Sequence, residues 1–340
     1  MRNILQILWA VLGVALLAAV IWWSGPAEVL SALAASRGHP WLLAAGVGLF
    51  AVAQATFLLK WHWMSRRAGA EVSFRQSLRL FGTLMLVGTF TPGRAGELAV
   101  PLLMRGGTRL TGTVIVNRLL ESTGTICAGL FTAVLLLSGD PRIVRLWNVA
   151  YVLALLLVLL GILSQRRATA AVLGFVRRCL RPMARWRPVA WLLGQEQRWA
   201  TDLEPFYEAN ERILRPWPIL IFAALMVLVW MLVVSANYAL ILATLPLGAK
   251  EVTFLIVLSA VAVSAVAMFV SPIPGGLGLS EFTVLGLFAH FGYQAQLFVP
   301  FLLLVRVALY VVIVLLYLLG RFAGRDLPTP APAAPVVAPS

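Results

Sequence analysis

The sequence predicts an all-α fold that crosses a membrane several times. Of the 340 residues, 61% are hydrophobic and only 12% are charged, which is about half of the roughly 25% found in soluble domains. Six apolar segments are each long enough to cross about 30 Å of hydrocarbon as a helix. We therefore expect about six full spans, near residues 4–23, 41–60, 112–138, 146–164, 217–245 and 296–319.

The same composition excludes a water-soluble enzyme and a nucleic-acid-binding protein, because no sizeable soluble domain remains after the apolar segments are assigned. The net charge is +14, and the basic residues are 25 arginines and two lysines. In a membrane protein such an excess reports topology and contact with anionic lipid. The two cysteines and three histidines are too scattered to predict a metal site, and we expect no cofactor.

Two further apolar stretches, 74–104 and 252–292, are each interrupted by a cluster of proline and glycine, at residues 91–97 and 271–278. Proline and glycine end helices. We therefore predict two re-entrant hairpins of broken helix in addition to the six spans.

The placement of basic residues predicts the orientation of the chain. If both termini are cytoplasmic, the short inside segments carry ten basic residues and the outside loops carry four, which agrees with the positive-inside rule. The ten are Arg2, Lys60, Arg66, Arg67, Arg75, Arg79, Arg105, Arg109, Arg321 and Arg325, and the four are Arg37, Arg142, Arg145 and Lys250. This solution requires the first hairpin to enter from the cytoplasm and the second from the opposite side.

Residues 1–322 form one predicted transmembrane domain that contains a basic linker at 165–216, and residues 323–340 form a proline-rich tail expected to be disordered. The linker has apolar residues at helical spacing and a cluster of arginines between Arg177 and Arg187. It fits two amphipathic helices on the anionic inner leaflet and, equally well, a solvated helical hairpin.

The two broken stretches share a pattern beyond their prolines. In each, a Pro-Gly turn is followed by a glutamate and then by a spanning segment that contains an arginine. The pairs are Glu97 with Arg118, 21 residues apart, and Glu281 with Arg306, 25 residues apart. Since the two copies also have opposite predicted orientations, we expect an inverted repeat, an architecture that places a substrate between the repeats.

These residues are suited to binding an anion in the membrane. A broken helix exposes backbone N–H groups, glycine allows close approach, and arginine grips phosphate oxygens. A charge in a spanning helix costs at least about 2.5–3.5 kcal/mol unless it is compensated, so a polar cavity or a carboxylate must face it. The candidate substrate-binding residues are Arg94, Gly96, Glu97, Arg118, Glu121, Gly275, Gly276, Gly278, Glu281 and Arg306.

A structural role is the alternative for each of these residues. Glu97 and Glu281 would then cap the half-helices, and Arg118 and Glu121, three residues apart, would form a packing ion pair. Asn117, Asn237 and Ser280 fit interhelical hydrogen bonding better than ligand contact.

Four segments resemble a known family. Residues 92–98 (Pro-Gly-Arg-Ala-Gly-Glu-Leu) resemble the P-x-R-x-G-E-L signature of the lysylphosphatidylglycerol synthase transmembrane-region family, and 274–281 resemble its P-G-G-x-G-x-x-E element. Residues 117–121 are similar to its E-R-x-x-D element, with Asn117 in place of Glu and Glu121 in place of Asp. Residues 306–310 resemble its final span.

This resemblance covers nearly the whole chain and implies a bacterial inner-membrane protein of about eight hydrophobic segments that handles lipids. In related proteins a domain of this type flips an aminoacylated phospholipid beside a soluble synthase domain, and others are associated with hopanoids or polyprenyl-linked sugars. The aminoacyl-transfer domain is missing from this sequence. A separately encoded lipid-synthesis enzyme is therefore an expected partner.

Three functions remain open from the sequence. The first is a lipid translocase, without enzymatic activity, for a phospholipid or polyprenyl-linked lipid with an anionic headgroup. The second is a proton-coupled transporter of a small solute, with Glu97 or Glu281 as the proton carrier. The third is a non-transporting membrane subunit that recruits a lipid-modifying enzyme through the basic linker.

Overall fold

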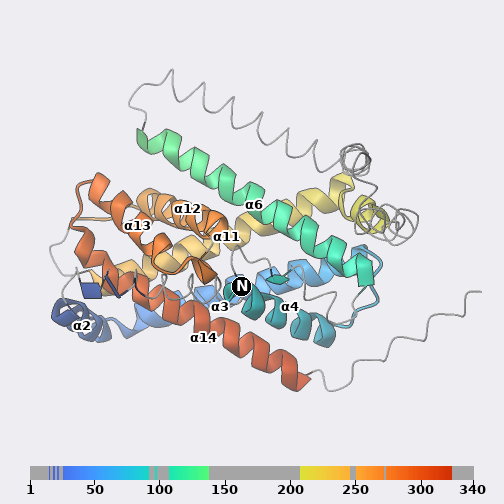
Figure 1. The fold of residues 1–340 in the computed structure, drawn as a ribbon, viewed down its shortest axis with the longest axis horizontal. Helices are drawn as coiled ribbons and strands as arrows, with labels where there is room; N and C mark the ends of the chain where they lie inside the picture. Colours follow the sequence, from blue (N-terminus) through green and yellow to red (C-terminus); the bar gives the residue numbers. More distant parts are fainter. Residues whose placement is uncertain are drawn as a thin grey trace, which may run out of the picture.

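The computed structural model describes residues 26–91, 96–97, 107–137, 207–245, 250–271 and 273–323, with positions 15, 18, 19, 21 and 22. Within these residues every element is a helix (Figure 1), as the sequence predicts. The elements are α2 (Pro26–Ala35), η1 (Ser36–Gly38), α3 (Pro40–Arg67), α4 (Phe74–Thr89), α6 (Gly107–Leu137), α11 (Pro216–Thr244), α12 (Phe254–Val270), η4 (Pro274–Gly276), α13 (Leu279–His290), η5 (Ala295–Phe298) and α14 (Val299–Ala323).

Local sequence signals explain where these helices begin. α3 and α11 start with Pro40 and Pro216, whose missing N–H has no helical partner at this position in any case. α4 starts with a capping box, in which Ser73 and Gln76 each accept a hydrogen bond from the other's backbone N–H. The Thr253 side chain caps α12 by accepting a hydrogen bond from the backbone three residues on.

Three helical stretches are long and apolar enough to cross a membrane: Pro40–Arg67, Pro216–Thr244 and Ala295–Phe322. They contain the predicted spans near 41–60, 217–245 and 296–319. The predicted span 112–138 corresponds to α6, which has 31 residues. Both α3 and α6 continue past their apolar runs, because no proline interrupts the polar turns at 61–67 and 107–111.

Other predicted segments lie outside the described residues. They are the spans near 4–23 (apart from its isolated positions) and 146–164, the linker up to residue 206, and the tail from residue 324. Residues 207–213, at the end of the linker, are helical.

The two Pro-Gly clusters interrupt their helices where the sequence predicts. α4 ends at Thr89 and α12 ends at Val270, after 16 and 17 residues. At 1.5 Å per residue these helices are about 24 and 26 Å long, which is less than the roughly 30 Å of a hydrocarbon core. α13 is shorter still, with 12 residues, and packs against α12.

The broken helix of each copy of the sequence pattern packs against a helix of the other copy. α3 packs along α11, α4 packs along α14, and α12 packs along α6, so each broken helix lies against the charged span of the other copy. Corresponding helices run in opposite directions: in Figure 1, α3 and α14 run from left to right, whereas α11 and α6 run from right to left. This is the geometry that an inverted repeat requires.

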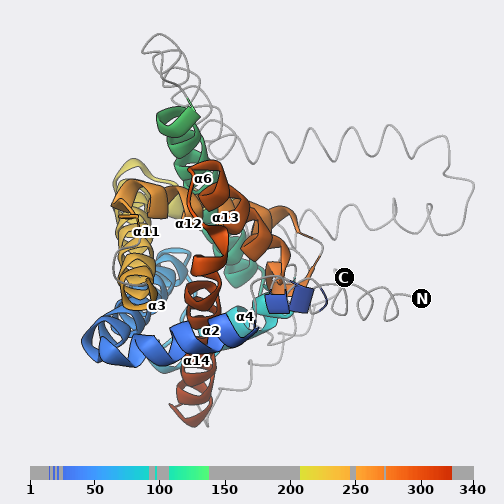
Figure 2. The ribbon, with the colours of Figure 1, turned by 90° about the vertical axis from the view of Figure 1, so that its left-hand side faces the viewer.

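Each copy also has its own cluster of buried apolar side chains. One joins α11, α12, α13 and α14 and includes Phe50 of α3. The other joins α3, α4 and α6 and includes Val229 of α11 and Ile313 of α14. In the end-on view, α3 and α11 form one side of the bundle, and α12 lies beside α6 and packs against α13 (Figure 2).

Glycine brings α4 and α14 into backbone contact. A Cβ added at Gly82 would lie 2.8 Å from the Tyr317 backbone, and one added at Gly320 would lie 2.7 Å from the Arg79 backbone. Small residues are common where membrane helices approach closely, because packing rather than hydrophobic exclusion holds such helices together.

We expect Gly82→Ala to destabilise the protein by about 1–3 kcal/mol, because the two backbones must separate to admit one methyl group. Gly48→Ala is the matched control, since a Cβ at Gly48 meets nothing within 4 Å and alanine favours a helix. Thermal unfolding of both variants in detergent measures the difference. Equal midpoints for the two variants would contradict close α4–α14 packing.

Candidate functional site

The Glu97 side chain packs against the end of α4. The Thr91 hydroxyl accepts a hydrogen bond from the Gly96 N–H at 3.0 Å and donates one to the Val87 carbonyl at 2.9 Å, which closes the turn. The space beside Gly88 is filled by the Glu97 carboxylate, so any Cβ at position 88 would collide with it. Glu97 is consequently only 2% exposed.

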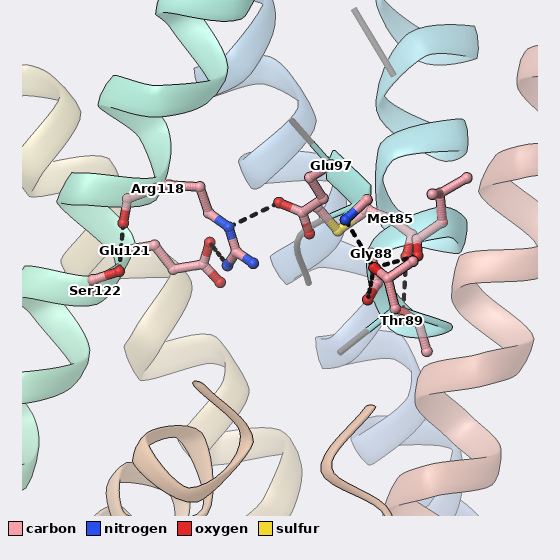
Figure 3. A network of polar contacts seen from close by, with 10 residues as sticks. Met85, Gly88, Thr89, Glu97, Arg118, Glu121 and Ser122 are labelled. Carbon is pink, nitrogen blue, oxygen red and sulfur yellow. Dashed lines mark hydrogen bonds and ion pairs between the residues drawn. The ribbon is translucent and has the colours of Figure 1, made fainter. Parts of the chain in front are cut away.

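Glu97 and Glu121 hold Arg118 between them (Figure 3). Arg118 Nε lies 3.0 Å from Glu97 Oε2, and Arg118 Nη1 donates to Glu121 Oε2 at 3.2 Å. The third guanidinium nitrogen, Nη2, makes no hydrogen bond to any residue that the structure describes. Arg118 is thus neutralised by two carboxylates but keeps one donor available to a ligand.

Arg306 uses all three of its nitrogens to hold the second broken helix. Nε pairs with Glu281, Nη1 donates to the Gly275 carbonyl at 2.9 Å, and Nη2 donates to the Ser280 hydroxyl. Ser280 Oγ also lies 3.0 Å from Glu281 Oε2. Arg306, Ser280 and Glu281 are all buried, so this cluster ties the span to the Pro-Gly turn.

The second Pro-Gly turn depends on glycine for its backbone conformation. Gly275, Gly276 and Gly278 have φ angles of 61°, 63° and 77°, a region that side chains with a Cβ rarely adopt. A Cβ added at Gly275 would lie 3.1 Å from the Thr89 carbonyl oxygen. The two interrupted helices therefore meet, with the turn of one copy against the end of α4 in the other.

Two cavities lie between the copies, one after the other along the helix axes. The first has a volume of about 250 Å³ and reaches Phe50, Asn237 and Phe301. The second has a volume of about 180 Å³ and reaches Phe57, Met226 and Ile313, which are about two to three turns further along α3, α11 and α14. The polar side chains on the wall common to both are Gln54, Glu121, Thr125 and Arg306.

The structure brings five of the ten predicted site residues to these cavities. Arg118, Glu121, Glu281 and Arg306 line the first, and Gly275 lines the second. Glu97 pairs with Arg118, and Gly96, Gly276 and Gly278 shape the two turns. Arg94 lies outside the described residues.

Two of the structural alternatives can be assessed at this site. Glu281 lies in the first turn of α13 but makes no capping hydrogen bond there; its carboxylate faces Arg306 and Ser280. Ser280 accepts a hydrogen bond from Arg306 that joins α13 to α14, as the interhelical alternative expects, and it also lines the first cavity. Asn237 instead bonds within its own helix, to the Val233 carbonyl at 2.8 Å, and lines the first cavity.

Sequence reasoning missed Gln54 and did not expect the burial of Lys60. Gln54 is 9% exposed, lines both cavities and has an Oε1 atom without a hydrogen-bond partner in the described part of the chain. An amide within the apolar run 41–60 was the available signal. Lys60 was assigned to the cytoplasmic end of that span, but α3 continues for seven more residues and Lys60 is fully buried.

We expect Arg306→Met to destabilise the protein by about 3–5 kcal/mol, because Glu281 is then left buried without its cation. The double variant Glu281→Gln, Arg306→Met removes both charges and should be more stable than Arg306→Met alone. Arg212→Met is the matched control, because Arg212 is half-exposed and its ion pair lies at the surface. Thermal unfolding in detergent measures all three, and additive losses in the double variant would contradict the pairing.

Comparison with known proteins identifies a family for the chain. No curated protein and no solved structure matches the chain significantly. The family model described as "Lysylphosphatidylglycerol synthase TM region" matches residues 10–316, a range that includes both broken helices, both arginine-bearing spans and the cavities between them. The chain belongs to the lysylphosphatidylglycerol synthase transmembrane-region family.

Proposed function

We propose that this membrane protein is a lipid translocase, and not an enzyme, for a phospholipid or polyprenyl-linked lipid with an anionic headgroup. The observation that carries the proposal is the polar wall between two opposed broken helices, where Arg118 lines a largely apolar cavity and its Nη2 has no hydrogen-bond partner among the described residues. Membership of a family with a lipid-related role supports it.

The two arginines have different roles in this proposal. Arg306 is saturated by Glu281, Ser280 and the Gly275 carbonyl, so it holds the turn in place. Arg118 Nη2 donates to a headgroup oxygen, a charge-assisted hydrogen bond that is strong in a site of low dielectric. The acyl chains stay in the bilayer, while the headgroup passes between the first and the second cavity along their common wall.

The distribution of basic residues supports a location in the bacterial inner membrane with both termini cytoplasmic. The end of α3, the start of α4, the start of α11 and the end of α14 lie at the same end of the bundle (Figure 1). This end carries Arg66, Arg67, Arg75, Arg79, Arg212, Arg215 and Arg321, and the opposite end carries Arg37 and Lys250. The proposal places the arginine-rich end at the anionic inner leaflet, where the linker would also bind and where a separate lipid-synthesis enzyme would deliver substrate.

We expect Arg118→Ala to slow lipid translocation about tenfold or more, because a hydrogen bond to a charged group is worth about 1.5–3 kcal/mol. The measurement is the rate at which a fluorescent phosphatidylglycerol becomes accessible to a quencher in proteoliposomes. Arg212→Ala, which removes an arginine from the bundle's exposed end, is the matched control and should leave the rate unchanged. Equal rates for wild type and both variants would refute the site.

The competing proposal of proton-coupled solute transport makes a different prediction in the same vesicles. Glu97 and Glu281, its expected proton carriers, both lie in buried ion pairs, so loading a proton requires breaking a pair. Translocation of the lipid without an imposed pH gradient supports the lipid translocase. Dependence on the gradient, together with competition from a small solute, would favour the second reading.

A further inference from the structure

Lys60 is a buried cation that has no role in the proposed function as described above. It lies on α3, one turn beyond Phe57, and is 0% exposed. Its Nζ atom lies 3.2 Å from Met226 Sδ and 4.5 Å from the centroid of the Phe57 ring. Among the residues that the structure describes, no carboxylate lies within ion-pair distance of this ammonium. A thioether and an aromatic face compensate a buried charge only partly.

Lys60 contacts two side chains that line the second cavity, while it is not itself part of that lining. Phe57 and Met226 both line that cavity, as does Glu121, the carboxylate that acts electrostatically on Lys60 from beyond ion-pair distance. Methionine is unbranched and changes rotamer easily. A shift of the Met226 side chain would therefore bring the ammonium into contact with the cavity without any movement of a helix.

The charges around the cavities suggest an electrostatic role for Lys60. Among the residues that the structure describes, two arginines face three glutamates there, because Arg118 lies between Glu97 and Glu121 while Arg306 pairs with Glu281. Without Lys60 these described side chains would carry one excess negative charge, which would repel an anionic headgroup. Lys60 brings the sum to zero and places the added positive charge beside the second cavity.

We propose that Lys60 is a second anion-binding group, which binds the phosphate oxygens of a headgroup in the second cavity after Arg118 has bound them in the first. The inference rests on the proposed function for the identity of the anion as a lipid, because inorganic phosphate offers the same oxygens. On this path the headgroup binds first to Arg118 Nη2 at the first cavity and then to Lys60 Nζ, next to Met226, at the second.

The sequence allows a direct test, because the chain has only two lysines, Lys60 and Lys250. Labelling lysine with ¹⁵N in the full chain in maltoside micelles gives two side-chain Nζ resonances, assigned with Lys250→Arg. We expect phosphatidylglycerol to shift the Lys60 resonance, and diacylglycerol with the same acyl chains to shift neither. Lys250, which donates to the Phe291 carbonyl at 2.9 Å, is the internal control.

The remaining outcomes of the titration decide the proposal. A shift with inorganic phosphate alone would keep the anion site but overturn the lipid as its source. An equal shift with diacylglycerol, or no shift with either anion, would overturn the site. These results are independent of transport: if no lipid is translocated, the proposed function fails while a specific Lys60 shift still stands.

Substitution provides a second readout. We expect Lys60→Met to weaken phosphatidylglycerol binding about tenfold, while Lys60→Arg retains most of the binding because it keeps the charge. Lys250→Met is the matched control and should bind as wild type does. A Lys60→Met protein that unfolds at the wild-type temperature and binds the lipid equally well would overturn the proposal. If that variant fails to fold, the resonance shift in the wild-type chain decides.

Discussion

The burial of an arginine on a membrane-spanning helix is the constraint on which the rest of this structure depends. An uncompensated charge at that depth costs at least about 2.5–3.5 kcal/mol, so each arginine requires a carboxylate at the same depth. Glu97 meets this need for Arg118, and Glu281 meets it for Arg306. Because each glutamate follows a Pro-Gly break, the ion pairs fix how deep the breaks lie. The cavities between the copies follow from that position.

The two ion-pair clusters occupy equivalent positions in the repeat but differ in how their arginines are hydrogen-bonded. In the second copy, each nitrogen of the Arg306 guanidinium bonds to a group of its own repeat, including the Gly275 carbonyl of the turn. In the first copy, Glu97 and Glu121 share Arg118, and its Nη2 makes no hydrogen bond to any of the described residues. Symmetry of sequence pattern therefore does not imply identical hydrogen bonding. Arg306 holds the turn of its own copy, whereas the proposed function gives Arg118 the contact with the ligand.

Sequence reasoning could find the breaks and the charge pairs because both obey local or general rules. A cluster of proline and glycine interrupts a helix, and intramembrane charges need partners. Lys60 and Gln54 were harder because hydropathy alone does not locate the end of a helix, and an amide in a span more often joins helices than meets a ligand. The exchange of α4 and α12 between copies could not be predicted, since it depends on which apolar faces fit together in three dimensions.

That exchange has a mechanical consequence for any movement between the copies. α4 lies against α14 at Gly82 and Gly320, where the two backbones touch without intervening side chains. Side chains also pack beside this contact, since Leu84 of α4 and Ile313 of α14 belong to one apolar cluster, so the two helices resist both separation and sliding. Arg306, on α14, also holds the Gly275 turn, which abuts the end of α4 at Thr89. A displacement of α4 would therefore involve α14 and this turn, and with them the Arg306 side chain on the wall common to both cavities.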